Sequence, residues 1–272
     1  MNPILHKYNT RADTINSLVC VGLDPEIDRI PAHFRSAELP FFEFNKFIID
    51  QTAAYTAAYK PNIAFYEARG ILGLTELQRT MQYLRTEHPD IVTICDAKRG
   101  DLANTNRGYV TAIFDHLAAD AITLHPYLGA EALAPFLERR DKACIILCRT
   151  SNPGAREFQD LLIDNQPLWQ VIAKRVANHW DTDGNCMLVV GATYPEEMRR
   201  IRELTPNLTF LVPGVGAQGG DVAAVVAAGI DANNRGLMIS SSRAILFAED
   251  PAAAARNLRD EIRNAVQAAR GL

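Results

Sequence analysis

The chain has 272 residues, of which 48% are hydrophobic and 22% are charged, and its formal net charge is −4. This is the composition of an ordinary globular protein, and no block of Lys or Arg indicates a surface for nucleic acid or for an anionic membrane. The apolar runs are shorter than the ~18 residues that a membrane-spanning helix needs, and the first residues lack the apolar region of a signal peptide, so we expect a cytoplasmic protein.

Eight short apolar runs recur along the chain, and each is followed by a turn and then by a stretch with helical periodicity. The runs cover residues 18–22, 57–60, 91–96, 121–124, 143–148, 187–190, 209–212 and 236–239. Amphipathic stretches between them include residues 75–87, 167–179, 195–204 and 221–228. Strands that alternate with helices pair in parallel, so the pattern predicts an α/β protein with a single (β/α)8 TIM barrel domain over residues 1–272, an open doubly wound sheet being the alternative. The long first connection, residues 25–44, is expected to be an elaborated βα loop with a short helix.

Polar side chains follow most of the predicted strands. In a barrel of this kind the chemistry takes place at the C-terminal ends of the strands, on the βα loops. The polar residues at these places are Asp24, Lys60, Asn62, Asp96, Lys98, Asp101, His125, Thr150, Ser151, Asn152, Thr193 and those in segments 214–220 and 240–243. A packed core does not require polar groups at so many strand ends, so we predict a functional site at this rim.

The most informative of these segments is Asp-Ala-Lys-Arg-Gly-Asp at residues 96–101, which ends the apolar run that begins at Ile91. In a strand the side chains of residues i and i+2 share a face, so Asp96 and Lys98 are expected to project together, with Asp101 following in the turn. A lone Asp-x-Lys is usually a weak surface ion pair. Two carboxylates around one lysine at the C-terminal end of a strand instead favour an active site.

The loops after the seventh and eighth predicted strands have the composition of a phosphate site. Residues 213–221 read Pro-Gly-Val-Gly-Ala-Gln-Gly-Gly-Asp, and residues 240–243 read Ser-Ser-Ser-Arg. Barrels often bind phosphate with these two loops, where glycines let backbone N–H groups approach the anion and an arginine supplies a bidentate fork. The glycines also match the G-x-G-x-x-G dinucleotide motif, but they follow the seventh strand instead of the first, and the next strand ends in serine instead of an acidic ribose ligand, which disfavours NAD.

Taken together, these motifs resemble those of a known family. Lys60 and residues 96–101 resemble the Lys…Asp-x-Lys-x-x-Asp tetrad of the orotidine 5′-phosphate decarboxylase family, and residues 150–155, 213–221 and 242–243 resemble its other motifs in the same order. The resemblance runs from about residue 21 to about residue 248, and residues 147–154 are similar to its longer bacterial (type 2) branch. It implies that a homodimer converts orotidine 5′-monophosphate to uridine 5′-monophosphate and CO₂, the last step of de novo pyrimidine nucleotide synthesis, without a cofactor or a metal.

The resemblance also implies a role for each residue of the tetrad. Asp24 and Lys60 would bind the ribose hydroxyls, and Lys60 would also be ion-paired into the tetrad. Asp96 would lie against the substrate carboxylate, and Lys98 would protonate C6 as CO₂ leaves. Asp101 would complete the network from the other subunit of the dimer.

Five further residues would bind the substrate if the resemblance holds. Thr105 would cross the dimer interface together with the last aspartate and reach the ribose. Ser151 would form a hydrogen bond with the pyrimidine edge, and Gln218 would link that serine to the phosphate. Ser242 is included in the same substrate-binding set, and Arg243 would hold the phosphate.

Three alternatives to this function differ in the role that they give to the lysines. Sugar-phosphate decarboxylases that resemble the family carry a magnesium-binding glutamate at the position of Lys60, and a protonated lysine cannot coordinate a metal. A Schiff-base aldolase would use Lys98 as its nucleophile, but two flanking carboxylates keep that lysine protonated. A non-catalytic nucleotide-binding module has no need to collect these charges.

The cysteines are not expected to form disulfides or a metal site, and a few rim residues have no predicted role. The five cysteines are odd in number and mostly lie in apolar runs, which indicates reduced core thiols in a cytosolic protein. Cys144 and Cys148 are four residues apart without a His or Cys pair at zinc spacing, so we expect no metal site. The sequence assigns no role to His125, Tyr127, Arg149, Glu67 and Arg69, although His125 is expected to be a packed residue.

Overall fold

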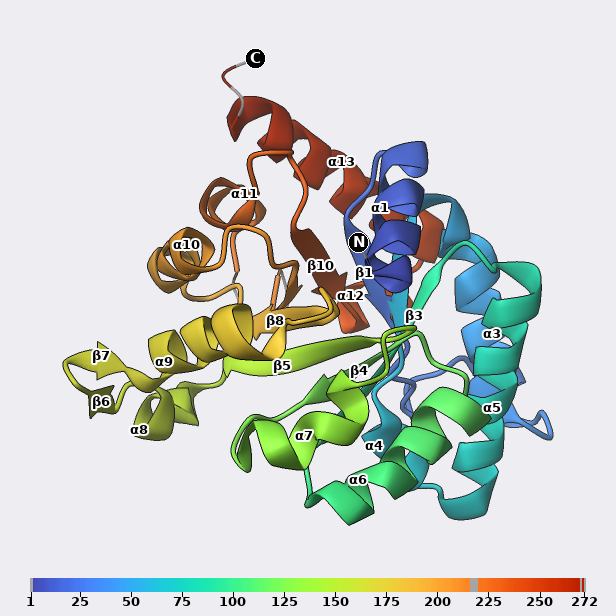
Figure 1. The fold of residues 1–272 in the computed structure, drawn as a ribbon. Helices are drawn as coiled ribbons and strands as arrows, with labels where there is room; N and C mark the ends of the chain where they lie inside the picture. The colour runs from blue at the N-terminus through green and yellow to red at the C-terminus, as the bar shows by residue number, and fades with distance from the viewer. Residues whose placement is uncertain (1, 216–219, 270, 272) are drawn as a thin grey trace.

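The eight apolar runs form the strands of a closed barrel in the computed structural model, which describes residues 2–215, 220–269 and 271 (Figure 1). The strands are β1 (Val19–Gly22), β2 (Ala58–Lys60), β3 (Val92–Arg99), β4 (Ala121–Leu124), β5 (Ala143–Arg149), β8 (Cys186–Val190), β9 (Phe210–Pro213) and β10 (Leu237–Ser241). Neighbouring strands pair in parallel, and the pairing of β10 with β1 closes the ring, with Val19 opposite Ile239. The predicted (β/α)8 barrel is therefore confirmed.

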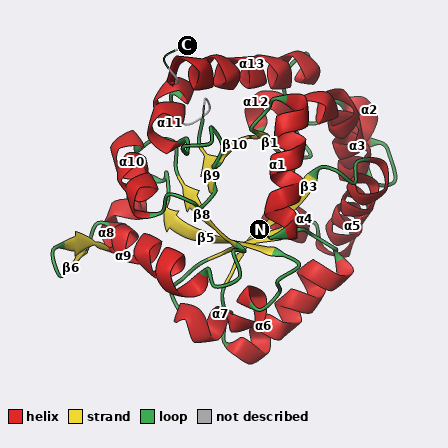
Figure 2. Cartoon of the chain, turned by 45° about the horizontal axis from the view of Figure 1, so that its top comes forward, coloured by secondary structure: helices red, strands yellow, loops and turns green. Residues whose placement is uncertain are grey.

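Helices surround the ring of strands, as Figure 2 shows. The predicted amphipathic stretches correspond to α5 (Gly70–Glu87), α9 (Leu168–Arg175) with its continuation η4 (Val176–Trp180), α10 (Pro195–Leu204) and α11 (Val222–Gly229). The remaining outer helices include α3 (Pro40–Thr52), η1 (Ala53–Tyr55), α4 (Ile63–Glu67), α6 (Ala103–Val110), η2 (Thr111–His116), α7 (Gly129–Leu137), α12 (Arg243–Leu246) and α13 (Pro251–Ala269). Helix α5 begins earlier than predicted because two glycines in its first turn, Gly70 and Gly73, interrupt the apolar pattern.

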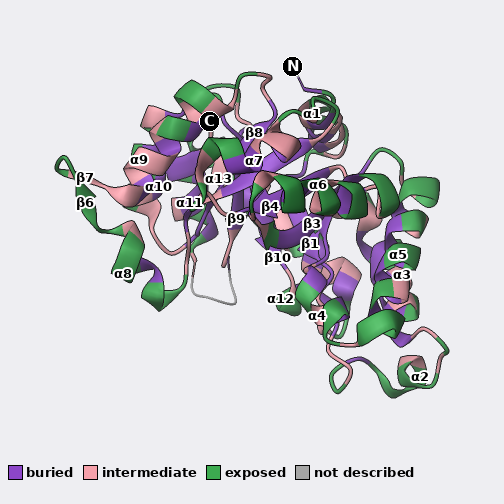
Figure 3. Ribbon diagram, turned by 60° about the horizontal axis from the view of Figure 1, so that its bottom comes forward, coloured by how far each residue is buried: buried purple, intermediate pink, exposed green. Residues whose placement is uncertain are grey.

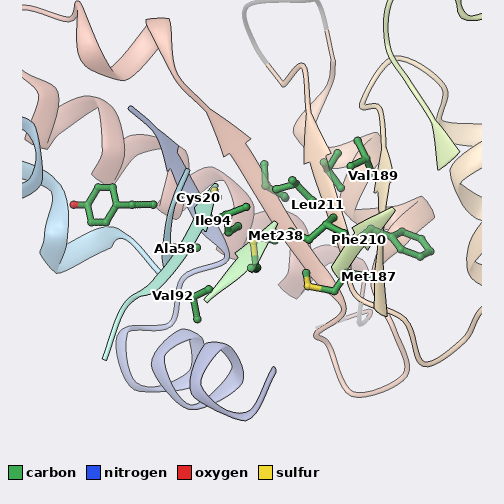
Figure 4. Packing of buried hydrophobic residues seen from close by; sticks show 14 of the residues in the cluster. Cys20, Ala58, Val92, Ile94, Met187, Val189, Phe210, Leu211 and Met238 are labelled. Atoms are coloured by element: carbon green, nitrogen blue, oxygen red, sulfur yellow. The ribbon is translucent and has the colours of Figure 1, made fainter. Parts of the chain in front are cut away.

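The hydrophobic core fills the barrel and the layer between the strands and the helices. Almost every strand residue is buried (Figure 3), which explains why the strands have continuous apolar sequences instead of alternating ones. Buried side chains from several strands pack together, among them Ile94, Met187, Leu211 and Met238 (Figure 4). All five cysteines are buried free thiols, as expected.

Helix α1 (Pro3–Ile15), which the sequence analysis did not predict, packs against the N-terminal ends of the strands. The hydroxyl of Tyr8 donates a hydrogen bond of 2.6 Å to the carbonyl oxygen of Leu237, the first residue of β10. Arg11 donates to the carbonyl oxygen of Thr56, just before β2. These contacts stabilise the N-terminal end of the barrel. The polar residues predicted to form the site lie at the C-terminal end.

Two connections at the C-terminal end of the barrel are longer than a simple turn. The first, after β1, contains the expected short helix, α2 (Ala32–Arg35), but the predicted loop runs too far because α3 already begins at Pro40. The second follows β5 and contains η3 (Pro153–Ala155), α8 (Arg156–Gln159) and a hairpin of β6 (Leu162–Ile163) and β7 (Gln166–Pro167).

The hairpin projects away from the barrel (Figure 1). Its two turn residues, Asp164 and Asn165, have φ angles of 50° and 60°, a conformation that Asp and Asn tolerate better than most residues. The hairpin is not evident in the sequence because each of its strands has only two residues. No helix in the described part of the chain is both long enough and apolar enough to span a membrane.

Candidate active site

One buried carboxylate stands between two lysines at the C-terminal ends of β2 and β3. Asp96 Oδ2 lies 2.8 Å from Lys60 Nζ, and Asp96 Oδ1 lies 2.6 Å from Lys98 Nζ. The hydroxyl of Thr123, on β4, donates a further hydrogen bond of 2.8 Å to Oδ1. The structure thus brings together three of the four tetrad residues that the sequence predicted, and it adds a threonine that the sequence analysis missed.

Lys98 reaches Asp96 through an irregularity in β3. The register between β3 and β4 shifts between Cys95 and Arg99, and Lys98 has a φ angle of 48°, which is uncommon for a residue with a side chain. The backbone N–H of Lys98 leaves the regular ladder and donates to Thr123 Oγ1 at 3.0 Å. The two side chains therefore meet as predicted, but at a bulge instead of on the common face of a regular strand. Bulges often redirect a side chain beside an active site.

Burial and ion pairing shift the pKa values of Asp96 and Lys60 in opposite directions. Burial alone would raise the pKa of Asp96, but Lys60 and Lys98 outweigh it and hold that pKa well below its ordinary value. Burial alone would lower the pKa of Lys60, but Asp96 and Asp24 outweigh it and raise that pKa above its ordinary value. Both groups are therefore charged at neutral pH. The side chain of Lys98 is 49% exposed, so its ammonium group is available at the barrel mouth.

Asp24 and Ser242 both lie close to Gly22, the last residue of β1. Asp24 Oδ1 accepts a hydrogen bond of 3.0 Å from the backbone N–H of Asn62, which links the first two strand ends. A Cβ atom on Gly22 would lie 2.7 Å from Ser242 Cβ and 3.2 Å from Asp24 Oδ2, so only glycine permits this approach. The buried hydroxyl of Ser242 has no hydrogen-bond partner within the described residues.

Lys60, Asp96 and Lys98 form a triad, and Asp101 lies outside it in its own chain. Within the described residues it forms no ion pair with Lys60 or Lys98, and its Oδ1 instead accepts the backbone N–H of Leu102 at 2.6 Å. Asp101 and Lys98 nevertheless line a common cavity of about 340 Å³, together with Arg99, Gly100, Tyr109, His125, Tyr127 and Leu128. Thr105 lies exposed on α6, one turn further along.

Ser151 follows β5 and packs against the backbone of the next barrel strand. A Cβ atom on Gly191 would lie 2.8 Å from Ser151 Cβ, and the N–H of Gly191 donates to the carbonyl oxygen of Arg149 at 2.7 Å. The backbone N–H of Thr150 donates to Gln159 Oε1 at 2.9 Å, and Gln159 Nε2 donates back to the Thr150 hydroxyl at 2.8 Å. These contacts fix the loop that carries Ser151.

Arg149, whose role the sequence left open, is buried beside this loop. Its Nη1 lies 2.9 Å from Asp160 Oδ1, and its Nη2 lies 3.5 Å from Glu197 Oε1. Its guanidinium carbon also lies 4.1 Å from the ring centre of Tyr194. Arg149 therefore joins the segment after β5 to α10. The sequence signal was a charged residue at the end of an apolar run, which does not reveal its partners.

The two predicted phosphate loops are neighbours because β9 and β10 pair. Val215 forms a bridge with Gly220, and the Gly220 N–H donates to the carbonyl oxygen of Gly214 at 3.2 Å. A Cβ atom on Gly220 would lie 2.5 Å from Ala192 Cβ, so this position requires glycine. Arg243 is exposed at the start of α12 and forms no ion pair within the described residues. Gln218 lies outside the described residues.

No group of three or more His, Cys, Asp or Glu side chains in the described part of the chain is placed to hold a metal ion. The charges of the lysine–aspartate group indicate what chemistry the site can perform. A carboxylate neutralised by two ammonium groups presents one of them, on Lys98, at an open mouth. Such a fixed cation can stabilise negative charge that develops on a bound molecule, and it can also donate a proton.

The chain matches known proteins along most of its length. A family model described as orotidine 5′-phosphate decarboxylase / HUMPS family matches residues 17–258. A protein of Cellvibrio japonicus named orotidine 5′-phosphate decarboxylase is 47% identical over 260 residues, which cover 94% of each chain.

Solved structures give the same result. The structure of Leishmania donovani OMP decarboxylase superposes with a TM-score of 0.88 and 39% identity, over 97% of this chain and 99% of that one. The structure of Leishmania donovani UMP synthase gives a TM-score of 0.89 and 41% identity over 96% of this chain, which spans 56% of that longer protein. The chain belongs to the orotidine 5′-phosphate decarboxylase / HUMPS family.

Proposed function

We propose that the chain catalyses the decarboxylation of orotidine 5′-monophosphate to uridine 5′-monophosphate and CO₂, the last step of de novo pyrimidine nucleotide synthesis. The observation that carries this proposal is the buried Asp96 carboxylate between the ammonium groups of Lys60 and Lys98. Relatives of nearly the same length that share almost half of the residues are named for this activity.

The reaction needs the kind of stabilisation that this site offers. Loss of CO₂ from C6 of the pyrimidine leaves a carbanion that no adjacent carbonyl group delocalises. A fixed cation at C6 stabilises that charge, and its proton then completes the product. Lys98 has both properties, because its ammonium group is ion-paired at 2.6 Å to Asp96 and its side chain is half exposed at the mouth. In this proposal Asp96 keeps Lys98 charged and faces the substrate carboxylate.

Lys60 distinguishes this reaction from that of the sugar-phosphate relatives. It is buried and ion-paired, and its pKa is raised above the ordinary value, so it carries a proton and has no lone pair for a metal. The ion pair of Lys98 likewise argues against a Schiff base, which requires an unprotonated amine. We therefore propose that neither a metal nor another cofactor takes part.

The substrate would lie across the barrel mouth from the triad to the phosphate loops. Asp24 and Lys60 would bind the ribose hydroxyls, and Ser151 would bind the pyrimidine edge, with Gln218 linking that serine to the phosphate. Ser242 and Arg243 would hold the phosphate. The support for this assignment is that the Ser242 hydroxyl is buried without a partner and that Arg243 forms no ion pair within the described residues. Neither group therefore has a protein partner within the described residues with which a phosphate would have to compete.

We further propose a homodimer in which Asp101 and Thr105 serve the active site of the other subunit. Asp101 does not pair with Lys98 in its own chain, although both line the same cavity. Large apolar side chains are exposed around this cavity, including Leu102 at 59%, Tyr127 at 86% and Leu128 at 44%. An exposed apolar patch beside an incomplete site is typical of a surface that a second copy covers.

The five buried free thiols support a location in the reducing cytoplasm.

The proposal is tested by following the absorbance of orotidine 5′-monophosphate with the purified chain, with Lys98→Ala as the inactive control. We expect absorbance loss and CO₂ release that exhaustive chelation does not reduce. If the chain binds uridine 5′-monophosphate without turning over the substrate, it is a nucleotide-binding module. Activity that chelation abolishes and magnesium restores would favour the sugar-phosphate reaction, and borohydride trapping on Lys98 would favour the aldolase.

A further inference from the structure

Asn106 on α6 forms an unusual set of contacts for a residue with no assigned role. It is wholly buried, and its side-chain amide brackets the backbone of a single residue, Asp101. Asn106 Oδ1 accepts the Asp101 N–H at 3.0 Å, and Asn106 Nδ2 donates to the Asp101 carbonyl oxygen at 2.6 Å. The same Nδ2 donates to the carbonyl oxygen of Ala132 on α7, also at 2.6 Å. Both donors of the amide are thus used.

These contacts fix the turn that carries Asp101 in a way that its surroundings do not require. Leu102, the next residue, is 59% exposed, and Asp101 itself is only partly buried. A loop at the surface can satisfy its backbone with water, so the two hydrogen bonds from the buried amide to Asp101 are an added restraint on the position of that residue. The ring of His125 lies against Gly100 in the same turn, because a Cβ atom on Gly100 would lie 2.7 Å from its Nε2.

The restraint leaves one oxygen of the Asp101 carboxylate available. Oδ1 accepts the backbone N–H of Leu102 at 2.6 Å, which orients the carboxylate plane relative to α6. Oδ2 forms no hydrogen bond or ion pair within the described residues. The backbone is therefore held by Asn106, one carboxylate oxygen is held by Leu102, and the other oxygen can act elsewhere.

We propose that Asn106 is a positioning residue for the reaction, which acts by holding Asp101 in the place where its carboxylate completes the lysine–aspartate network. This inference rests on the proposed function of Asp101. A neutral amide suits the task because it can donate to two carbonyl oxygens and accept one N–H without adding a charge beside the carboxylate. Misplacement of a catalytic group by about 1 Å can cost roughly 100-fold in rate.

A double-mutant cycle tests the proposal. We expect Asn106→Ala to lower kcat at least about tenfold with a smaller effect on KM, and to add little when Asp101→Asn is already present. Asn106→Leu keeps the branched shape of the side chain and removes its three hydrogen bonds without burying a charge. It should show the same loss of kcat, and Tm measured on both variants separates a loss of folded protein from a loss of positioning.

Asn185 provides a matched structural control. It is also wholly buried, and its Nδ2 donates to the carbonyl oxygens of Leu137 at 2.9 Å and Arg139 at 3.3 Å, before the start of β8 and far from the mouth. Asn185→Ala should lower Tm without lowering kcat. If the Asn106 variants lower only Tm, or if their loss of kcat persists unchanged in the Asp101→Asn background, the positioning role is wrong.

Mixed dimers then show on which site Asn106 acts. Asn106→Ala chains mixed with Lys98→Ala chains should regain activity, because one site then combines an intact Lys98 with an Asp101 that an intact Asn106 holds. Recovery with Asp101→Asn chains but not with Asn106→Ala chains would overturn the inference about Asn106 alone. Failure of both mixtures would remove the shared-site proposal, and the double-mutant cycle would still decide the role of Asn106.

Discussion

Thr123 binds Lys98 and Asp96 with the two sides of one hydroxyl group. It accepts the backbone N–H of Lys98 at 3.0 Å and donates to Asp96 Oδ1 at 2.8 Å, so the bulge in β3 and the charge network depend on the same side chain.

Thr123→Val keeps the shape of the side chain and removes this hydroxyl. We expect it to lower kcat and to destabilise the fold by about 1–3 kcal/mol, because the Lys98 N–H then has no partner. Steady-state kinetics and urea unfolding measure the two effects. Thr205→Val is the control, since the buried Thr205 hydroxyl donates a hydrogen bond to the carbonyl oxygen of Ile201 in the last turn of α10. Normal kcat in Thr123→Val would show that the bulge holds Lys98 without help.

Arg243→Ala should weaken substrate binding and also lower turnover. A charge-assisted contact to phosphate is worth roughly 1.5–3 kcal/mol, and remote binding energy of this kind can be used to assemble the reacting end of the site. Binding of uridine 5′-monophosphate should weaken, while binding of uridine, which lacks the phosphate, should not. Arg199→Ala, an exposed arginine on α10, is the control. Equal effects on the nucleotide and the nucleoside would exclude Arg243 from the phosphate site.

Chains with Lys98→Ala and chains with Asp101→Asn should each be nearly inactive alone and active when mixed. In a mixed dimer one site carries both lesions, and the other combines an intact Lys98 with an intact Asp101 from its neighbour. Random exchange makes about half of the dimers mixed, so roughly a quarter of all sites should work between C2 partners. Activity after verified subunit exchange measures the fraction. No recovery would mean that Asp101 acts within its own chain.

The ion pairs of Asp96 should make stability depend on pH in the acid range. The folded-state pKa of Asp96 lies well below its unfolded value of about 3.9, so its contribution is fully present above about pH 4 and is lost as pH falls through the folded-state pKa. Urea unfolding of the wild type and of Asp96→Asn should therefore show a difference in unfolding free energy that shrinks below about pH 4. A constant difference down to pH 2 would contradict the assigned charge state.

The sequence was sufficient to predict the barrel because each strand is buried on both faces and has a continuous apolar run. It was also sufficient for the triad, since Lys60, Asp96 and Lys98 occupy strand ends that a closed barrel must bring to one rim. Helix α1 escaped notice because only Ile4, Tyr8 and Ala12 are buried along its length, which makes a weak apolar pattern.

The missed details depend on contacts that are remote in sequence. The bulge at residues 96–99 is stabilised by Thr123, and the turn at Asp101 is bracketed by Asn106, yet neither partner differs in type from an ordinary strand threonine or helix asparagine. Arg149 likewise pairs with Asp160 and Glu197 only after the segment that follows β5 has folded back toward α10. The partners of the Asp101 carboxylate on another chain stay a prediction.

The hydrogen bond from Tyr8 to Leu237 joins residues that are 229 positions apart. During synthesis α1 therefore leaves the ribosome long before β10, the strand that it contacts, has been made. Strand β1 is also made long before β10, its partner in the barrel. Until β10 has been made, the apolar side of α1 and one edge of β1 lack the strand that covers them in the folded protein. Ring closure is thus a long-range event, and contacts between such distant residues generally slow folding and prolong the exposure of apolar surface.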